Sequence, residues 1–139
     1  MTDTSCREVV DAFYAAIAGK DAEAVTSVVT EHFADDVVLD LPASLPYGGR
    51  IEGVRRLVKI FAHAAGSTAA VGVQDLQLAS LLGDGPQVAA HLTFTWFPAG
   101  AGASFGSSVL ELWTFDAGRV ISIEAFYQDT AALVAVAPS

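Results

Sequence analysis

Two polar side chains interrupt apolar stretches near the C-terminal end of the chain, and both could take part in proton transfer. His91 lies within residues 88–97 and Glu111 within residues 107–115, among Val, Leu, Phe and Trp. The segment between them is rich in Pro, Gly and Ala, which is typical of a turn. A hairpin centred on Ala101 would place residue 91 opposite residue 111 on one side of a sheet. A histidine beside a carboxylate on an apolar surface is a candidate acid–base pair, because burial and a charged neighbour both shift pKa values.

The alternation of side chains along these two strands defines two faces. One face, with polar and aromatic side chains, would suit a pocket for an apolar molecule with a few placed polar groups. It would consist of His91, Thr93, Thr95, Phe97, Glu111, Trp113 and Phe115. The other face could pack on a second subunit. It would include Leu92, Phe94, Leu110 and Leu112. The alternatives are a surface ion pair of His91 with Glu111 and a monomer with a two-sided core, in which Thr serves strand propensity.

The elements that must position these residues follow a simple order. Helical spacing of apolar residues predicts helices over about 9–18, 22–34 and 54–65, and a short strand over 37–41 precedes the third helix. Strand-like stretches follow over 71–82, 87–97, 104–115 and 119–127, separated by Gly- and Asp-containing turns, with a short helix over 129–136. Helices first and strands later predict one α+β domain, residues 1–139, with an antiparallel sheet.

Composition limits the classes of function. The chain has 139 residues, of which 53% are hydrophobic, which is enough for a core and an apolar pocket. A formal net charge of −9 argues against nucleic acid or an anionic membrane as a partner. Cys6 is the single cysteine, which excludes an internal disulfide and a cysteine-ligated zinc site. Neither a signal peptide nor a membrane-spanning run is evident, so we expect a cytoplasmic protein.

Four segments together resemble the nuclear transport factor 2-like superfamily, in its ketosteroid isomerase and SnoaL-like polyketide cyclase branches. The segments are residues 9–21, 33–40, 46–53 and 112–124. The resemblance covers nearly the whole chain. It implies a cone in which three N-terminal helices wrap a curved antiparallel sheet around a pocket, often dimeric through the sheet.

The resemblance also implies roles for individual residues. Asp40 falls where ketosteroid isomerases keep their base, although an Asp that turns the chain before Pro42 is the alternative. Glu111 falls where these isomerases keep a protonated carboxylic acid that helps to bind the oxyanion. The tyrosine on the first helix of the isomerases aligns with Phe13, one residue before Tyr14. The His91–Glu111 pair resembles the histidine and acidic residue that SnoaL-like cyclases carry on adjacent strands.

Two tyrosines complete the candidate site. Tyr47 lies on a loop at the expected pocket mouth, so it is the fourth candidate catalytic residue after His91, Glu111 and Asp40. Tyr14 and Phe61 are expected to line the substrate site, although the spacing of Tyr14 from Val10 also fits a core position.

No metal or cofactor is expected, because the three histidines belong to different elements and no nucleotide motif occurs. The sequence therefore predicts a cofactor-independent isomerase or cyclase. Its substrate would be a hydrophobic oxygenated metabolite such as a polyketide or terpenoid intermediate, and dehydration and epoxide-opening cyclisation are alternative reactions. A non-catalytic ligand-binding or assembly domain of the same fold is the alternative.

Overall fold

The computed structural model describes residues 5–45, 48–66, 72–98 and 103–135. Helix α1 (Cys6–Ala18) begins with a capping box, in which Ser5 Oγ accepts from the Glu8 backbone N–H and Glu8 Oε1 accepts from the Ser5 N–H. Helix α2 (Ala22–His32) begins at Asp21, whose Oδ1 accepts from the Ala24 N–H at 3.0 Å. The two caps fix where the helices start.

The strands form one six-stranded sheet in the order β2-β1-β6-β5-β4-β3. Neighbouring strands are antiparallel except for β1 and β6, which run parallel. The strands are β1 (Phe33–Leu41), β2 (Gly49–Glu52), β3 (Gly72–Leu82), β4 (Gln87–Phe97), β5 (Phe105–Asp116) and β6 (Arg119–Tyr127). Helix α3 (Val54–Gly66) follows β2, and α4 (Thr130–Ala135) follows β6.

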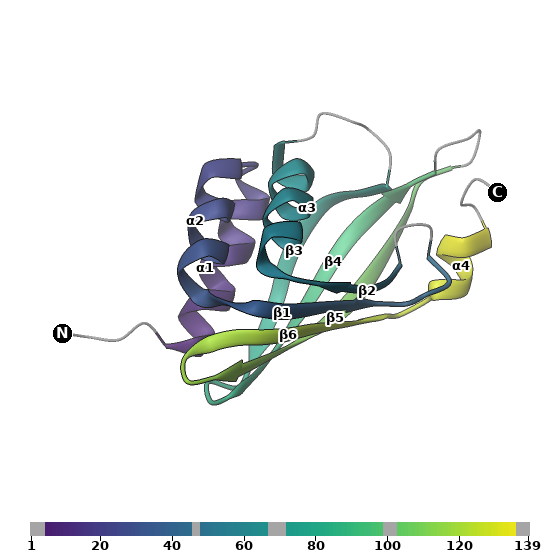
Figure 1. The fold of residues 1–139 in the computed structure, drawn as a ribbon. Helices are drawn as coiled ribbons and strands as arrows, with labels where there is room; N and C mark the ends of the chain where they lie inside the picture. The colour runs from purple at the N-terminus through teal and green to yellow at the C-terminus, as the bar shows by residue number, and fades with distance from the viewer. Residues whose placement is uncertain (1–4, 46–47, 67–71, 99–102, 136–139) are drawn as a thin grey trace.

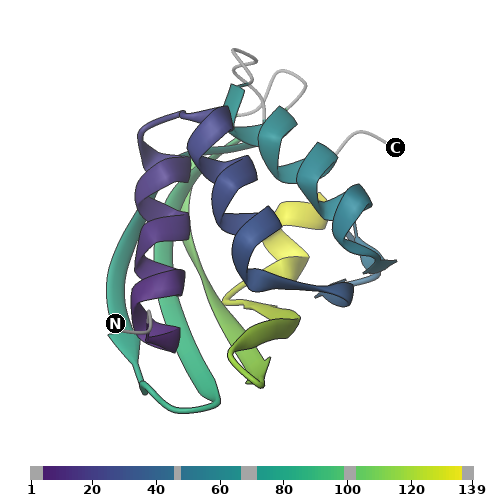
Figure 2. The same ribbon diagram turned by 60° about the vertical axis from the view of Figure 1, so that its left-hand side comes forward.

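Helices α1, α2 and α3 cover one face of the curved sheet, which we call the inner face, and leave the opposite, outer face without a helical layer (Figure 1). The view in Figure 2 shows the three helices side by side in front of the strands. At the centre of this layer, the rings of Phe13 and Phe33 pack against Trp113, which is fully buried, and the ring of Phe61 packs against both phenylalanines. The prediction of an α+β cone with three N-terminal helices is confirmed.

Two details of the predicted elements are wrong. The second helix ends at His32, because Phe33 is already extended and packs into the core, so β1 starts four residues earlier than predicted. Asp35 and Asp36 then lie exposed, where the pairing of β1 with β6 shifts register. The short strand β2 was missed altogether, since four residues at the sheet edge carry no extended apolar alternation.

Candidate active site

Glu111 is positioned on the inner face by the alternation of β5. Its neighbours two residues away, Val109 and Trp113, are buried, whereas Leu110 between them is 37% exposed on the outer face. Glu111 itself is half-buried, so solvent still reaches it. The strand therefore holds a carboxylate among apolar side chains beneath the helices, where an ionised group requires a hydrogen-bond partner.

Tyr14 on α1 is that partner. Its hydroxyl donates a hydrogen bond to Glu111 Oε1, and its oxygen accepts one from the Trp113 indole N–H at 3.0 Å. Tyr14 is only 4% exposed, and its ring meets Trp113 edge-on with centroids 5.8 Å apart. A chain of three side chains, Trp113–Tyr14–Glu111, thus runs from the buried core to the half-buried Glu111.

Burial shifts the proton equilibria of this chain in one direction. Desolvation raises the pKa of Glu111 above its ordinary value of 4.5, while the hydrogen bond from Tyr14 partly opposes the shift. The pKa of Tyr14 is raised well above 10.0, first by desolvation and then by the charge of Glu111. Tyr14 therefore remains a donor at any ordinary pH, and Glu111 keeps its proton to a higher pH than an exposed glutamate. This arrangement can hold a proton and release it to a ligand.

The predicted pairing of His91 with Glu111 is wrong. Ala90 pairs with Glu111 in the β4–β5 ladder, and His91 pairs with Leu110. The register is displaced by one residue from a hairpin centred on Ala101, and such a displacement moves every side chain of the strand to the other face. His91 therefore lies half-buried on the outer face and cannot act on the same ligand as Glu111.

The same displacement separates the residues that were expected to line one pocket. Thr93, Thr95 and Phe97 share the outer face with His91, and Thr93 is exposed. Conversely, Leu92 and Phe94, which were predicted to face a second subunit, are buried against the helices. Tyr14, Phe61, Trp113 and Phe115 do belong to the inner side, where Phe115 stacks on Trp113 at 6.4 Å.

Asp40 does not converge with Glu111 either. Leu39 and its partner Ile123 are buried on the inner face, so Asp40, one residue on, projects to the outer face beside Arg50 and Glu124. Arg50 is bonded to Glu52 at 2.8 Å, which is the main reason that its pKa is raised, and Asp40 adds to that effect. The predicted meeting of Asp40, His91 and Glu111 in one cavity is therefore wrong.

One residue near the network was missed by sequence reasoning. Tyr127 at the end of β6 pairs with Val109, so it lies diagonally across from Glu111 on the inner face. Its ring meets Phe94 edge-on at 5.9 Å, and its hydroxyl is near enough to Tyr14 to add to the rise of the Tyr14 pKa. The alternation of Ile123 and Ala125 before it was a signal that could have placed it.

The remaining predictions concern loops and ions. Tyr47 lies outside the described residues, so its role stays a prediction. Within the described ranges, no group of three or more His, Cys, Asp or Glu side chains is arranged to hold a metal ion. Likewise, none of the helices in the described part of the chain is long and apolar enough to cross a membrane.

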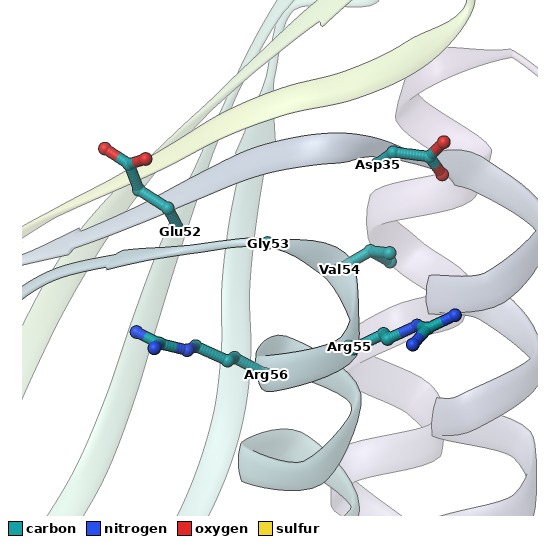
Figure 3. A pocket seen from close by; sticks show the side chains of 6 residues that line it. All are labelled: Asp35, Glu52, Gly53, Val54, Arg55 and Arg56. Carbon is teal, nitrogen blue, oxygen red and sulfur yellow. The ribbon is translucent and has the colours of Figure 1, made fainter.

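A surface hollow of about 470 Å³ lies elsewhere, where β1 and β2 meet the start of α3. Figure 3 shows Arg55 and Arg56 at its helical side, with Asp35 and Glu52 across from them. It contains none of the residues that sequence analysis selected, and its carboxylates and guanidinium groups are exposed. The candidate active site is therefore the Trp113–Tyr14–Glu111 chain of the inner face.

Comparison with known proteins places the chain in a family. Residues 10–123 match the SnoaL-like domain, so the chain belongs to the SnoaL-like domain family within the nuclear transport factor 2-like superfamily. This family includes isomerases and cyclases. No curated protein matches the sequence.

Solved structures agree on the fold. An NTF2-like protein from Burkholderia thailandensis E264 is similar with a TM-score of 0.76 and 21% identity, over 96% of this chain and 98% of that chain. Bal32a, from a soil-derived mobile gene cassette, has a TM-score of 0.74 and 20% identity, over 94% and 95%. A ketosteroid isomerase candidate from Kribbella flavida DSM 17836 has a TM-score of 0.62 and 20% identity, over 87% and 76%.

Proposed function

We propose that this protein is a cofactor-independent acid–base enzyme, an isomerase or cyclase, that acts on a hydrophobic oxygenated small molecule of the polyketide or terpenoid kind. The observation that carries the proposal is the hydrogen bond from Tyr14 to Glu111, a desolvated carboxyl group on a half-buried residue. A glutamate in this setting needs a reason to be there, because burying it costs free energy that an apolar side chain would not cost.

Glu111 would exchange the proton with the substrate. In its protonated form it donates to the carbonyl or epoxide oxygen of the ligand, and the negative charge that develops on that oxygen is stabilised by the bond as it forms. The carboxylate that remains is stabilised by the hydrogen bond from Tyr14 and takes the proton back at the end of the turnover. Apolar side chains at the margin of the inner face, among them Phe61 and Phe105, would contact the carbon skeleton.

Family membership supports this class of reaction, and the similarity to the ketosteroid isomerase candidate from Kribbella flavida favours isomerisation. The partner that removes a proton from carbon is a separate question. Among the described residues, no second carboxylate joins the hydrogen-bond network of Glu111. We propose a water molecule for that step, because Asp40 and His91 lie on the outer face, and we keep Tyr47 as a proposed hydrogen-bond donor to the substrate oxygen.

A non-catalytic ligand-binding domain is the second candidate. This candidate is supported by the same single carboxyl group, since one hydrogen-bond donor is enough to orient an oxygenated ligand. Proton transfer from one carbon to another often uses an additional acid or base. The two functions differ in one observable, because only the enzyme exchanges substrate protons with solvent.

The experiment measures that exchange. A panel of hydrophobic β,γ-unsaturated ketones is incubated with the protein in D₂O, and loss of the α-proton signal and double-bond migration are followed by NMR. We expect turnover by the wild type, a loss of roughly 10²-fold or more in Glu111→Gln, and little change in the outer-face control His91→Ala. Ligand binding without exchange would favour the second candidate, and equal rates for wild type and Glu111→Gln would overturn the proposal.

We also propose that the protein is a homodimer that associates through the outer face. Leu110 and Phe126 are cross-strand partners there and are 37% and 49% exposed. With Leu112 beside them, they form an apolar patch on the side of the sheet that carries no helices.

A further inference from the structure

We infer that Trp113 is a positioning residue for the Glu111 acid: its indole N–H fixes the direction of the Tyr14–Glu111 hydrogen bond and leaves Oε2 of Glu111 as the atom that donates to the ligand. This inference rests on the proposed function, which it deepens by naming the reacting atom. Trp113 was expected only to line the substrate site.

The direction follows from the number of protons in the network. An indole nitrogen can donate a hydrogen bond but cannot accept one, so Tyr14 Oη must be the acceptor of the 3.0 Å contact. The single proton of Tyr14 is then directed to Glu111 Oε1. In the opposite arrangement, Glu111 would carry its own proton on Oε1 and donate it to Tyr14. The Tyr14 proton would then have no acceptor among the described residues, and an unsatisfied buried donor costs free energy.

The donor is held rigidly in place. Trp113 is fully buried, with the rings of Phe13, Phe33 and Phe115 at centroid distances of 5.1, 5.6 and 6.4 Å. These contacts leave the indole no room to rotate its N–H away from Tyr14. The order of donors is therefore built into the core and does not depend on a ligand.

The other carboxyl oxygen remains available. Within the described part of the chain, Glu111 forms a hydrogen bond through Oε1 alone, so Oε2 has no protein partner there and can bond to a ligand that enters beside this half-buried residue. When Glu111 is protonated, its proton is placed on Oε2 because Oε1 already accepts from Tyr14. The acid proton is thus carried by the carboxyl oxygen that the Tyr14 bond leaves free.

The test removes the indole N–H with only a small change in the size of the side chain. Trp113 is replaced site-specifically by 3-benzothienylalanine, in which sulfur takes the place of the N–H. The pKa of Glu111 and the carbonyl stretch of its protonated form are followed by infrared titration without any ligand, with Glu111→Gln identifying the band. Phe13→Leu is the matched control, because it loosens packing against Trp113 and Tyr14, while Phe33 and Phe115 still hold the indole and both hydrogen bonds remain.

We expect the isostere to raise the pKa of Glu111 and to move the carbonyl stretch to higher frequency. Without the indole bond, Tyr14 becomes a weaker donor to the carboxylate, so the ionised form of Glu111 loses stabilisation and the protonated form is favoured. Tyr14→Phe should change both values in the same direction, and Phe13→Leu should change neither. Unchanged values in the isostere, or equal changes in Phe13→Leu, would overturn the inference.

The titration distinguishes this inference from the proposed function, because it needs no substrate. If the exchange reaction is absent but the isostere shifts the titration, the proposed enzyme is wrong and the hydrogen-bond order stands. If exchange occurs, the pH at which its rate changes should move upward in the isostere as the titration does, and an unmoved pH profile would exclude a positioning role.

Discussion

The ionised form of Glu111 is favoured by contact with water, yet this residue lies beneath three helices. Its hydrogen bond from Tyr14 offsets part of the cost of ionisation, but desolvation is the larger effect, because the pKa is raised despite the bond. The same imbalance that would let Glu111 act as the acid of the proposed reaction makes it a source of instability once it ionises. The proposed activity and the stability are therefore linked at this one residue.

The first prediction concerns stability against pH. Because the pKa of Glu111 is higher in the folded chain than in the unfolded chain, the folded state binds more protons between those two values, and the free energy of unfolding falls as pH rises through that interval. We expect Glu111→Gln to remove this component of the pH dependence and to be more stable than the wild type above it. Urea denaturation from pH 4 to pH 8 measures both curves, and parallel curves would contradict the raised pKa.

At this scale the sequence indicated Glu111 but not its partner. A glutamate amid Val, Leu and Trp on a strand is conspicuous, because such a side chain is seldom buried without a role. Tyr14 was assigned only to the substrate site or the core, since helical spacing from Val10 does not say what its hydroxyl meets. Contacts between α1 and β5, almost a hundred residues apart, depend on tertiary packing that local patterns do not contain.

At the scale of elements, the register of one hairpin decides which residues can work together. The boundaries of β4 and β5 follow from apolar runs and turn residues, and they were predicted within a residue or two. The pairing between the strands was not, because a turn rich in Gly and Ala does not fix its own length, and one residue exchanges the two faces. The burial of Leu92 and Phe94 beneath α1 selects the observed register.

The second prediction tests that register by thiol labelling. In a Cys6→Ser background, Thr93→Cys should react rapidly with a maleimide, because residue 93 is exposed on the outer face. Phe94→Cys should react only through unfolding, since residue 94 is 4% exposed and faces the core. The labelling rates of the two variants, measured at low protein concentration, should differ by orders of magnitude. Faster labelling of Phe94→Cys than of Thr93→Cys would instead support the pairing of His91 with Glu111.

The third prediction concerns the turn between β3 and β4. Gly83 has φ of +89°, and a Cβ there would lie 2.6 Å from the Gln87 carbonyl oxygen. We expect Gly83→Ala to destabilise the protein by roughly 1–3 kcal/mol, from strain and from the displaced strand end. Gly85→Ala is the control, because a Cβ at residue 85 meets nothing within 4 Å. Chemical denaturation compares the two, and equal stabilities would show that the turn tolerates another conformation.

At the scale of the whole molecule, helices cover one side of the sheet and leave the other without a helical layer (Figure 1). The fourth prediction is that Leu110→Lys with Phe126→Lys yields a folded monomer, because two cross-strand charges would oppose burial of the outer face. Ile60→Lys on α3 is the control, as residue 60 is 39% exposed on the helical side and should leave the dimer intact. Sedimentation equilibrium gives the masses, and a monomeric wild type at micromolar concentration would exclude this dimer.

The central claim is that Glu111 meets the oxygen of a hydrophobic ligand, and isothermal titration with 2-naphthol and 2-methylnaphthalene tests it most directly. The two compounds share a shape and differ in one oxygen, so their affinity ratio reports what that oxygen contributes. We predict that the wild type and the outer-face control Asp40→Asn bind 2-naphthol at least about 10-fold more tightly than 2-methylnaphthalene, which is the scale of a hydrogen bond to a charged or acidic group. Glu111→Leu should bind the two compounds with equal affinity. Equal affinities in the wild type, or a preference that survives Glu111→Leu, would contradict the account.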